Sequence, residues 1–235
     1  MQEVIISTNV KEIYNEKHSK NTFGHAPKRI YEWILEILGV ESGNRLLELG
    51  CGNGRFLYEA EKKGVLTYGI DISCVAIKKV KKICTSSRVL VSYAENLPYK
   101  DGYFDYMVAL GSLEHFMDPY QALNEMARVL KPKGRIFALV PNIVWVGHLL
   151  KLILHKIGIR DKRWFQPIER WATRKEWQEM IEQSGFKICK VHKYNYLHLP
   201  CDFLEQFYIR IASFSTLDLS YHFGFICECS SRYED

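Results

Sequence analysis

The chain has 235 residues, of which 47% are hydrophobic and 25% are charged, and its formal net charge is +5. This composition is typical of a globular protein with one large domain and excludes a largely disordered chain. The N-terminus carries charges and lacks a small-residue cleavage site, and no apolar run approaches the ~20 residues that span a bilayer. We therefore expect a cytoplasmic protein that is neither secreted nor membrane-spanning.

Cysteine spacing argues against both a disulfide framework and a metal site. The chain has seven cysteines and no C-x-x-C pair. Cys227 and Cys229 lie two residues apart in a strand-like run, but no second pair of ligands accompanies them. We therefore expect reduced thiols that act as small buried hydrophobic side chains, and no bound metal.

The N-terminal part of the chain, residues 1–45, is expected to form helices ahead of the first strand. Apolar residues recur at helical spacing from Ile30 to Leu38, and a glycine then ends the pattern. The segment before this helix is polar and aromatic and contains Tyr14 and His18. Such a segment is either a solvated leader or part of a ligand site.

The stretch LLELGCGNGRF, residues 46–56, organises the rest of the chain. It begins as an apolar strand with a carboxylate at Glu48 and breaks into glycines at alternate positions before helical spacing resumes. Glycines at such a turn let a ligand lie against backbone N–H groups. The E-x-G-x-G-x-G spacing differs from the G-x-G-x-x-G of dinucleotide sites and argues against NAD. Taken alone, the turn is equally consistent with a tight connection that binds nothing.

This stretch resembles the first motif of the class I S-adenosylmethionine-dependent methyltransferases. The resemblance implies one α/β domain with a Rossmann-like, mostly parallel sheet of seven strands in the order 3-2-1-4-5-7-6, with strand seven antiparallel and helices on both faces. It also implies S-adenosyl-L-methionine as the cofactor and S-adenosyl-L-homocysteine as its product. In that family, N-terminal segments often fold over the cofactor, so residues 1–40 are expected to be lid-like helices.

Asp71 stands at the end of the second expected strand, one strand-helix-strand unit after Glu48. Its two carboxylate oxygens match the two vicinal hydroxyls of a ribose, so we expect Asp71 to bind the cofactor ribose. An acid in this place also serves as a helix cap or turn residue, which is the alternative. Ile72 is expected to pack against one face of the adenine.

The segment SYAENLPYKDGYFDYMVALGSLEHF, residues 92–116, also resembles the family pattern. Tyr93 replaces an acid that is common there, so adenine recognition is expected to use the Tyr93 hydroxyl or the backbone of the next two residues, unless the ring packs in the core. The cofactor-binding residues that the resemblance implies are Glu48, Gly50, Cys51, Gly52, Asp71, Ile72, Tyr93, Ala94, Glu95 and Leu110.

His115 follows the fourth expected strand, residues 105–111, at the carboxyl edge of the sheet where ligands of open α/β folds bind. One interpretation is a general base or substrate anchor with a pKa near neutrality. The other is a turn histidine bonded to the backbone. Both stay open, and His115 is our candidate catalytic residue.

Local motifs mark the beginnings of two later helices. Asp118 and Pro119 are typical of a helix start before the fifth strand, 135–142. Thr173 with Glu176 forms a capping-box pattern. Two β runs, 185–196 and 222–230, then suit an antiparallel pair at the sheet edge.

Residues 143–172 are expected to form a helical insertion beside the substrate site, because apolar residues from Trp145 to Ile157 recur at helical spacing. Eight Lys or Arg side chains lie between Lys151 and Lys175. This charge suits an anionic substrate or a membrane surface. An ordinary solvated surface is the alternative.

We therefore expect an enzyme that transfers a methyl group from S-adenosyl-L-methionine to an O, N or C nucleophile of a small or medium-sized, anionic or amphiphilic molecule. A nucleic-acid methyltransferase is one alternative, which the basic insertion alone favours, and a non-catalytic cofactor-binding partner subunit is another. A small-molecule partner is preferred to nucleic acid. Peripheral membrane contact and the oligomeric state are left open.

Overall fold

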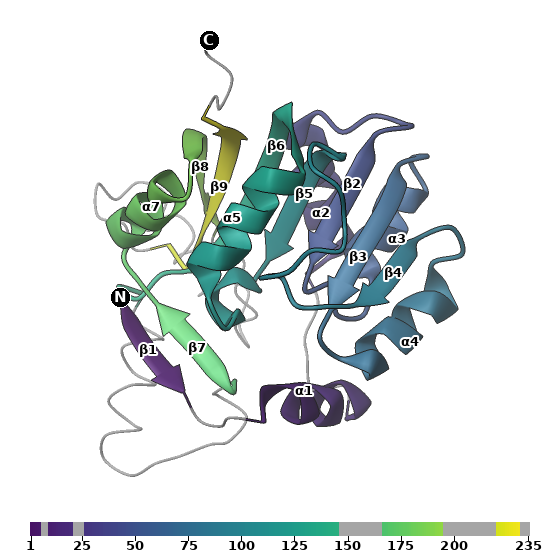
Figure 1. Ribbon diagram of the computed structural model, residues 1–235, viewed down its shortest axis with the longest axis horizontal. Helices are drawn as coiled ribbons and strands as arrows, with labels where there is room; N and C mark the ends of the chain where they lie inside the picture. Colours follow the sequence, from purple (N-terminus) through teal and green to yellow (C-terminus); the bar gives the residue numbers. More distant parts are fainter. Residues whose placement is uncertain (6–8, 21–25, 146–165, 195–219, 231–235) are drawn as a thin grey trace, which may run out of the picture.

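The computed structural model describes residues 1–5, 9–20, 26–145, 166–194 and 220–230. Seven strands form one sheet in the order β4-β3-β2-β5-β6-β9-β8, and β9 runs antiparallel to both neighbours (Figure 1). Counted along the chain within this sheet, the order is 3-2-1-4-5-7-6, so the predicted topology is confirmed. The strands are β2 (Arg45–Leu49), β3 (Leu66–Asp71), β4 (Arg88–Val91), β5 (Phe104–Leu110), β6 (Leu130–Pro141), β8 (Phe186–Tyr194) and β9 (His222–Cys229).

Helices cover both faces of the sheet, because its central strands are apolar on both sides. Side chains alternate along β2, so Leu46 packs with Leu35 and Phe56 on one face while Leu47 packs with Leu123 and Trp177 on the other. In Figure 1, α5 lies in front of the sheet and α2 and α3 lie behind it. One face carries α2 (Lys28–Leu38), α3 (Arg55–Glu61) and α4 (Cys74–Ile83). The other face carries α5 (Pro119–Val129) and α7 (Arg174–Gln183).

Side-chain caps begin the helices where the local motifs predict them. The Asp118 carboxylate accepts a hydrogen bond from the Gln121 N–H at the start of α5. Thr173 and Glu176 form a reciprocal capping box at the start of α7. Each cap satisfies N–H groups that the first turn of a helix leaves without partners. Both predicted helix starts are confirmed.

The N-terminus differs from the prediction. Strand β1 (Gln2–Ile5) pairs antiparallel with β7 (Ile168–Trp171) in a separate two-stranded sheet, so the predicted helix is wrong at both of these places. The pairing joins segments far apart in the chain, and local periodicity carries no signal for such a partner. Helices do follow β1, at α1 (Val10–Ser19) and α2. Most of the predicted helical insertion, residues 146–165, lies outside the described residues.

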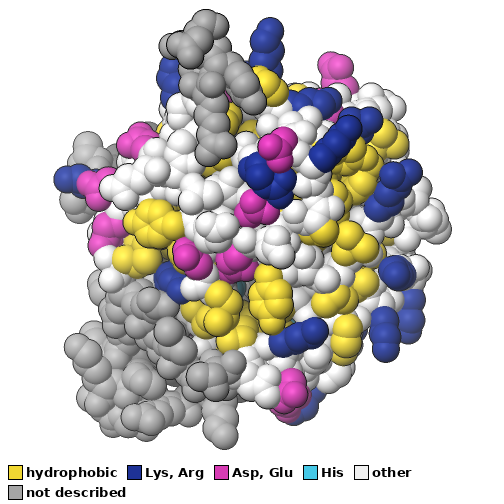
Figure 2. Space-filling view, viewed as in Figure 1, with side chains coloured by type: hydrophobic (Ala, Val, Ile, Leu, Met, Phe, Trp, Pro, Cys, Tyr) yellow, Lys and Arg dark blue, Asp and Glu magenta, His cyan; other side chains and the backbone are white. Residues whose placement is uncertain are grey.

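Positive charge also lies outside the predicted insertion. Lys78, Lys81 and Lys82 of α4 are exposed, as is Arg88 at the start of β4. Figure 2 shows Lys and Arg side chains on the side of the molecule where α4 and β4 lie. In the part of the chain that the structure describes, no helix is long and apolar enough to cross a bilayer.

Candidate active site

A cavity of about 260 Å³ opens at the carboxyl ends of β2, β3 and β5. Strand ends meet there because the parallel strands all run in one direction. The structure brings every predicted site residue to the wall of this one cavity. These residues are Glu48, Gly50, Cys51, Gly52, Asp71, Ile72, Tyr93, Ala94, Glu95, Leu110 and His115.

The glycine turn between β2 and α3 is shaped for close approach. Gly50 has φ = 70°, and a Cβ atom there would lie 2.7 Å from the Ser112 Cβ. Gly52 has φ = 49°, but a Cβ atom there would lie 3.7 Å from its nearest neighbour, the Cε1 of His18. The turn therefore packs tightly at Gly50, whereas at Gly52 a Cβ atom would make only an ordinary contact with His18. Gly52 itself lines the cavity.

Asp71 ties the end of β3 to the glycine turn. Its Oδ2 accepts a hydrogen bond from the Gly52 N–H at 2.9 Å, and its Oδ1 accepts one from the Ser73 N–H at 2.8 Å. Burial raises the Asp71 pKa to about 6, and the two N–H donors oppose this rise. The carboxylate plane is thereby fixed, and each oxygen keeps a second lone pair for a ligand.

Glu48 is a buried acid with an unused oxygen. The side chain is 5% exposed, and among the described residues its Oε2 has no hydrogen-bond partner. Burial, and after it the charge of Asp71, raises the Glu48 pKa well above its ordinary value. A buried acceptor without a donor is costly, so this oxygen suits a ligand that brings a donor or a positive charge.

The loop after β4 is held against α5. The Glu95 Oε1 accepts a hydrogen bond from the Asp118 N–H at 3.1 Å, and the Glu95 carbonyl accepts one from the Gln121 side chain at 3.4 Å. Tyr93 lines the cavity and is 47% exposed, so the interpretation of its ring as a core residue is wrong. This loop presents a fixed backbone and an open aromatic ring to the cavity.

His115 ends the short 3-10 helix η1 (Leu113–His115). Its Nδ1 lies 2.6 Å from the carbonyl oxygen of Ile168 in β7, so the backbone bond expected in one interpretation is present. Burial lowers the His115 pKa to about 4, so the expected value near neutrality is wrong. The imidazole is neutral at pH 7, and because the carbonyl can only accept, Nδ1 carries the proton.

Helix α1 forms a wall that the predicted set of site residues does not include. Val10, Tyr14 and His18 line the cavity, and their spacing of four places them on one helix face. This four-residue spacing can be seen in the sequence and could have indicated a helix face at the site. The Ser73 hydroxyl donates to the Asn15 Oδ1 at 2.7 Å and so anchors α1 to the start of α4.

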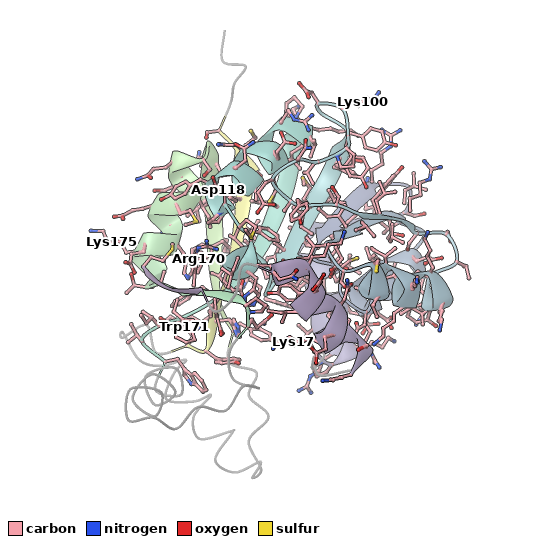
Figure 3. All side chains as sticks on the ribbon, turned by 60° about the horizontal axis from the view of Figure 1, so that its bottom comes forward. Lys17, Lys100, Asp118, Arg170, Trp171 and Lys175 are labelled. Carbon is pink, nitrogen blue, oxygen red and sulfur yellow. The ribbon has the colours of Figure 1, made fainter. Side chains whose placement is uncertain are left out.

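In the described part of the basic segment, Arg170 has a structural role. Arg170 is 5% exposed and donates to the carbonyl oxygens of Phe116 and Met117. Lys175, in contrast, has an 85% exposed side chain and points away from the protein (Figure 3). Arg160, Lys162 and Arg163 are three of the eight cations in this segment of the sequence, and they lie outside the described residues. The six described cysteines are free, and the described residues contain no group of three His, Cys, Asp or Glu that could hold a metal.

Comparison with known proteins points to methyl transfer. A family model described as a methyltransferase domain matches residues 47–138. A 27-O-demethylrifamycin SV methyltransferase from Amycolatopsis mediterranei is 36% identical over 132 residues, which cover 52% of this chain and 48% of that relative. An uncharacterized protein from Methanocaldococcus jannaschii is 32% identical over 212 residues, which cover 82% of each chain. The chain spans about half the length of the first curated relatives it matches.

A solved structure shows the same fold at lower sequence identity. It belongs to the complex between the Haloferax volcanii Trm112 methyltransferase activator and a methyltransferase. The TM-score is 0.72 at 18% identity, and the alignment covers 97% of this chain and 100% of that one. The likeness therefore extends through nearly the whole chain, beyond the glycine turn and its neighbouring strands.

Proposed function

The chain belongs to the class I S-adenosylmethionine-dependent methyltransferases, and we propose that it methylates an oxygen, nitrogen or carbon nucleophile of a small or medium-sized acceptor. The observation that carries this proposal is the cavity that gathers the strand-end residues. The proposed cofactor is S-adenosyl-L-methionine, and the product is S-adenosyl-L-homocysteine.

The donor set of the cavity fits this cofactor. Asp71 presents two oriented carboxylate oxygens, which suit the two ribose hydroxyls. Glu48 presents a buried oxygen without a described partner, which suits the ammonium of the methionine part. Gly52 lines the cavity and has no side chain, which supports a ligand that lies against the backbone of the turn. The adenine is proposed to lie among residues at the ends of β3, β4 and β5. These residues are Ile72, Tyr93, Ala94, Glu95 and Leu110.

The cofactor supplies an electrophilic methyl carbon on a sulfonium. The protein positions the acceptor for in-line attack, and well-oriented groups can contribute ~7–11 kcal/mol of barrier reduction. We assign His115 as the group that accepts the acceptor's proton, since it lines the cavity and its Nε2 is the unprotonated nitrogen. The fixed Nδ1 bond holds the ring in that tautomer.

The acceptor is proposed to be amphiphilic or anionic. Residues 143–172 and the N-terminal helix α1 are the segments that remain to cover the methyl group, since the strand ends are assigned to the cofactor. Trp145 is proposed to give the acceptor an apolar wall, and it packs edge-on against Tyr221 with 4.5 Å between ring centroids. The cations would come from the basic cluster Arg160, Lys162 and Arg163.

Calorimetry with S-adenosyl-L-homocysteine and with NAD tests the cofactor assignment. We expect binding of the first and none of the second. Gly52→Ala should abolish binding, because Gly52 lines the cavity. Gly102→Ala is the control and should not: Gly102 also has a positive φ, but it does not line the cavity. Equal effects of the two substitutions, or NAD binding, would overturn the assignment. Transfer of a labelled methyl group to an acceptor library then tests catalysis.

A further inference from the structure

Two ionisable side chains meet in η1 beside the cavity, and the second is unused in the function proposed above. Glu114 precedes His115 and is 4% exposed, and its Oε1 lies 3.7 Å from the His115 Nε2. The Oε1 also lies 3.7 Å from the point where a Cβ atom of Gly111 would stand, and Gly111 lines the cavity. Glu114 thus lies directly behind the cavity wall.

The tautomer of His115 determines what Glu114 faces. Because Nδ1 donates its proton to the Ile168 carbonyl, Nε2 carries a lone pair. An ionised Glu114 would place a second acceptor opposite that lone pair, and the other oxygen of Glu114, Oε2, has no hydrogen-bond partner among the described residues. The separation of 3.7 Å is too long for a hydrogen bond, but two buried acceptors at this distance are stabilised when one of them carries a proton.

We propose that Glu114 and His115 act as one coupled acid–base pair, which carries one proton at rest and, once it has released that proton to solvent, takes up the proton of the methyl acceptor. This rests on the function proposed above. In the step, the O–H or N–H bond of the acceptor breaks and an N–H bond forms at Nε2. The electron pair left on the acceptor atom forms the bond to the methyl carbon, and the pair returns to its one-proton state.

The ionisation tendencies of the two groups agree with this assignment of the proton. Burial raises the Glu114 pKa to about 8, and the charge of Glu169 adds to the rise. Burial lowers the His115 pKa to about 4. The one proton of the pair therefore lies on Glu114 at neutral pH, and the pair releases it to solvent near pH 8. The resulting carboxylate stabilises a protonated imidazole.

Other titratable groups face the pair from three sides. Tyr14 and Lys17 of α1 and Glu169 and Arg170 of β7 interact electrostatically with one or both members, and Tyr221 lies before β9. Figure 3 shows Lys17 on α1 and Arg170 on β7. Burial raises the Tyr14 pKa far above its ordinary value and lowers that of Lys17, so of these two groups Lys17 is the competing source of an alkaline titration.

Nitrogen-15 NMR of the imidazole side chains tests the proposal in the complex with S-adenosyl-L-homocysteine. The His115 signals are assigned by their loss in His115→Gln and followed from pH 5 to pH 10. We expect a shift change centred near pH 8 in the wild type, which reports the ionisation of Glu114. It should vanish in Glu114→Gln and remain in Lys17→Met. In Glu169→Gln it should remain with a lower midpoint, because one neighbouring negative charge is gone.

Two outcomes would overturn the pair. One is a wild-type His115 signal without an alkaline step, which needs no variant to fold. The other is a step that survives in Glu114→Gln. Calorimetry of S-adenosyl-L-homocysteine on the same samples keeps the two proposals apart: absent binding by the wild type contradicts the proposed function, whereas normal binding without the alkaline step contradicts the pair alone.

Discussion

The backbone N–H of Gly52 donates a hydrogen bond to the Asp71 Oδ2 across 2.9 Å, which joins the glycine turn after β2 to the end of β3. One carboxylate therefore fixes the turn and faces the cavity. Its second oxygen accepts from the Ser73 N–H, at the N-cap of α4. Turn, strand end and helix start are thus held in register by a single side chain.

Asp71→Ala should weaken binding of S-adenosyl-L-homocysteine at least tenfold. Each hydrogen bond to a charged group contributes ~1.5–3 kcal/mol, and two ribose hydroxyls would lose their acceptor. Calorimetry measures the effect, and a thermal scan separates it from loss of the turn contact. Glu36→Ala is the control, because Glu36 is an exposed acid of α2 and lies outside the cavity lining. Unchanged affinity in Asp71→Ala would remove this residue from the site.

Most of the sheet could be predicted because its signals are local. Leu46 and Leu47 face opposite layers, and a strand with apolar residues on both faces predicts helices on both sides. Caps at Asp118 and Thr173 likewise depend on residues within one helical turn. The strand order itself comes from the family resemblance. Because the strand ends of a parallel sheet meet at one edge, that order is enough to bring the predicted cofactor residues together.

The environment of His115 could not be predicted in this way. Its low pKa follows from burial, and its tautomer follows from the carbonyl of Ile168. Ile168 belongs to β7, whose partner β1 stands at the other end of the chain. The predicted helical insertion over 143–172 rests on apolar spacing between Trp145 and Ile157, which carries no signal for a strand at residues 168–171. The pairing of β1 with β7 therefore places the carbonyl that fixes the His115 tautomer. The residues near either strand in the sequence carry no signal for this pairing.

Glu114→Gln should change how stability depends on pH. Because folding raises the Glu114 pKa to about 8, the folded state binds this proton more tightly than the unfolded state does. The resulting stability is complete below about pH 4.5 and is lost as pH rises towards 8. Between pH 6 and pH 9 the wild type should therefore lose about 2–3 kcal/mol relative to the variant, whose amide does not titrate. Urea unfolding at both pH values measures this difference.

Glu179→Gln is the control for that experiment, since Glu179 pairs with Lys175 on the surface. Its stability should follow that of the wild type at both pH values, because exposed pairs contribute little. Parallel curves for the wild type and Glu114→Gln would contradict the assignment of a buried, proton-binding carboxyl.

Arg128→Met should lower both stability and cofactor affinity. The Arg128 guanidinium donates to the carbonyl oxygens of Leu97 and Tyr99 and pairs with Glu125, which in turn accepts from the Leu97 N–H. These bonds hold the end of the loop that lines the cavity. We expect a loss of about 2 kcal/mol in urea unfolding, discounted for partial exposure.

The matched control is Arg135→Met, because Arg135 pairs with Glu228 at the surface and its side chain is 45% exposed. It should cost less than about 0.5 kcal/mol. Weaker binding of S-adenosyl-L-homocysteine should accompany Arg128→Met only. An equal effect of the two substitutions would show that the loop does not depend on Arg128.

His115→Ala should lower kcat about a hundredfold or more while the substrate KM stays close to the wild-type value, because a general base acts mainly in the transition state. His192→Ala is the control: His192 packs against Trp33 and is not part of the cavity wall. The measurement is steady-state methyl transfer with the acceptor found in the library. A raised KM with unchanged kcat would make His115 a binding residue instead.

The basic cluster is expected to select the acceptor. Replacing Arg160, Lys162 and Arg163 together by alanine should raise the substrate KM about tenfold and leave the affinity for S-adenosyl-L-homocysteine unchanged, since an ion pair with an anionic acceptor in a solvated site contributes ~0.2–1 kcal/mol for each cation. Arg170→Met is the comparison variant for an effect on folding. Arg170 is buried and donates to the Phe116 and Met117 carbonyls, so its loss should lower the melting temperature. Wild-type kinetics in the triple variant would show that the cluster is an ordinary solvated surface.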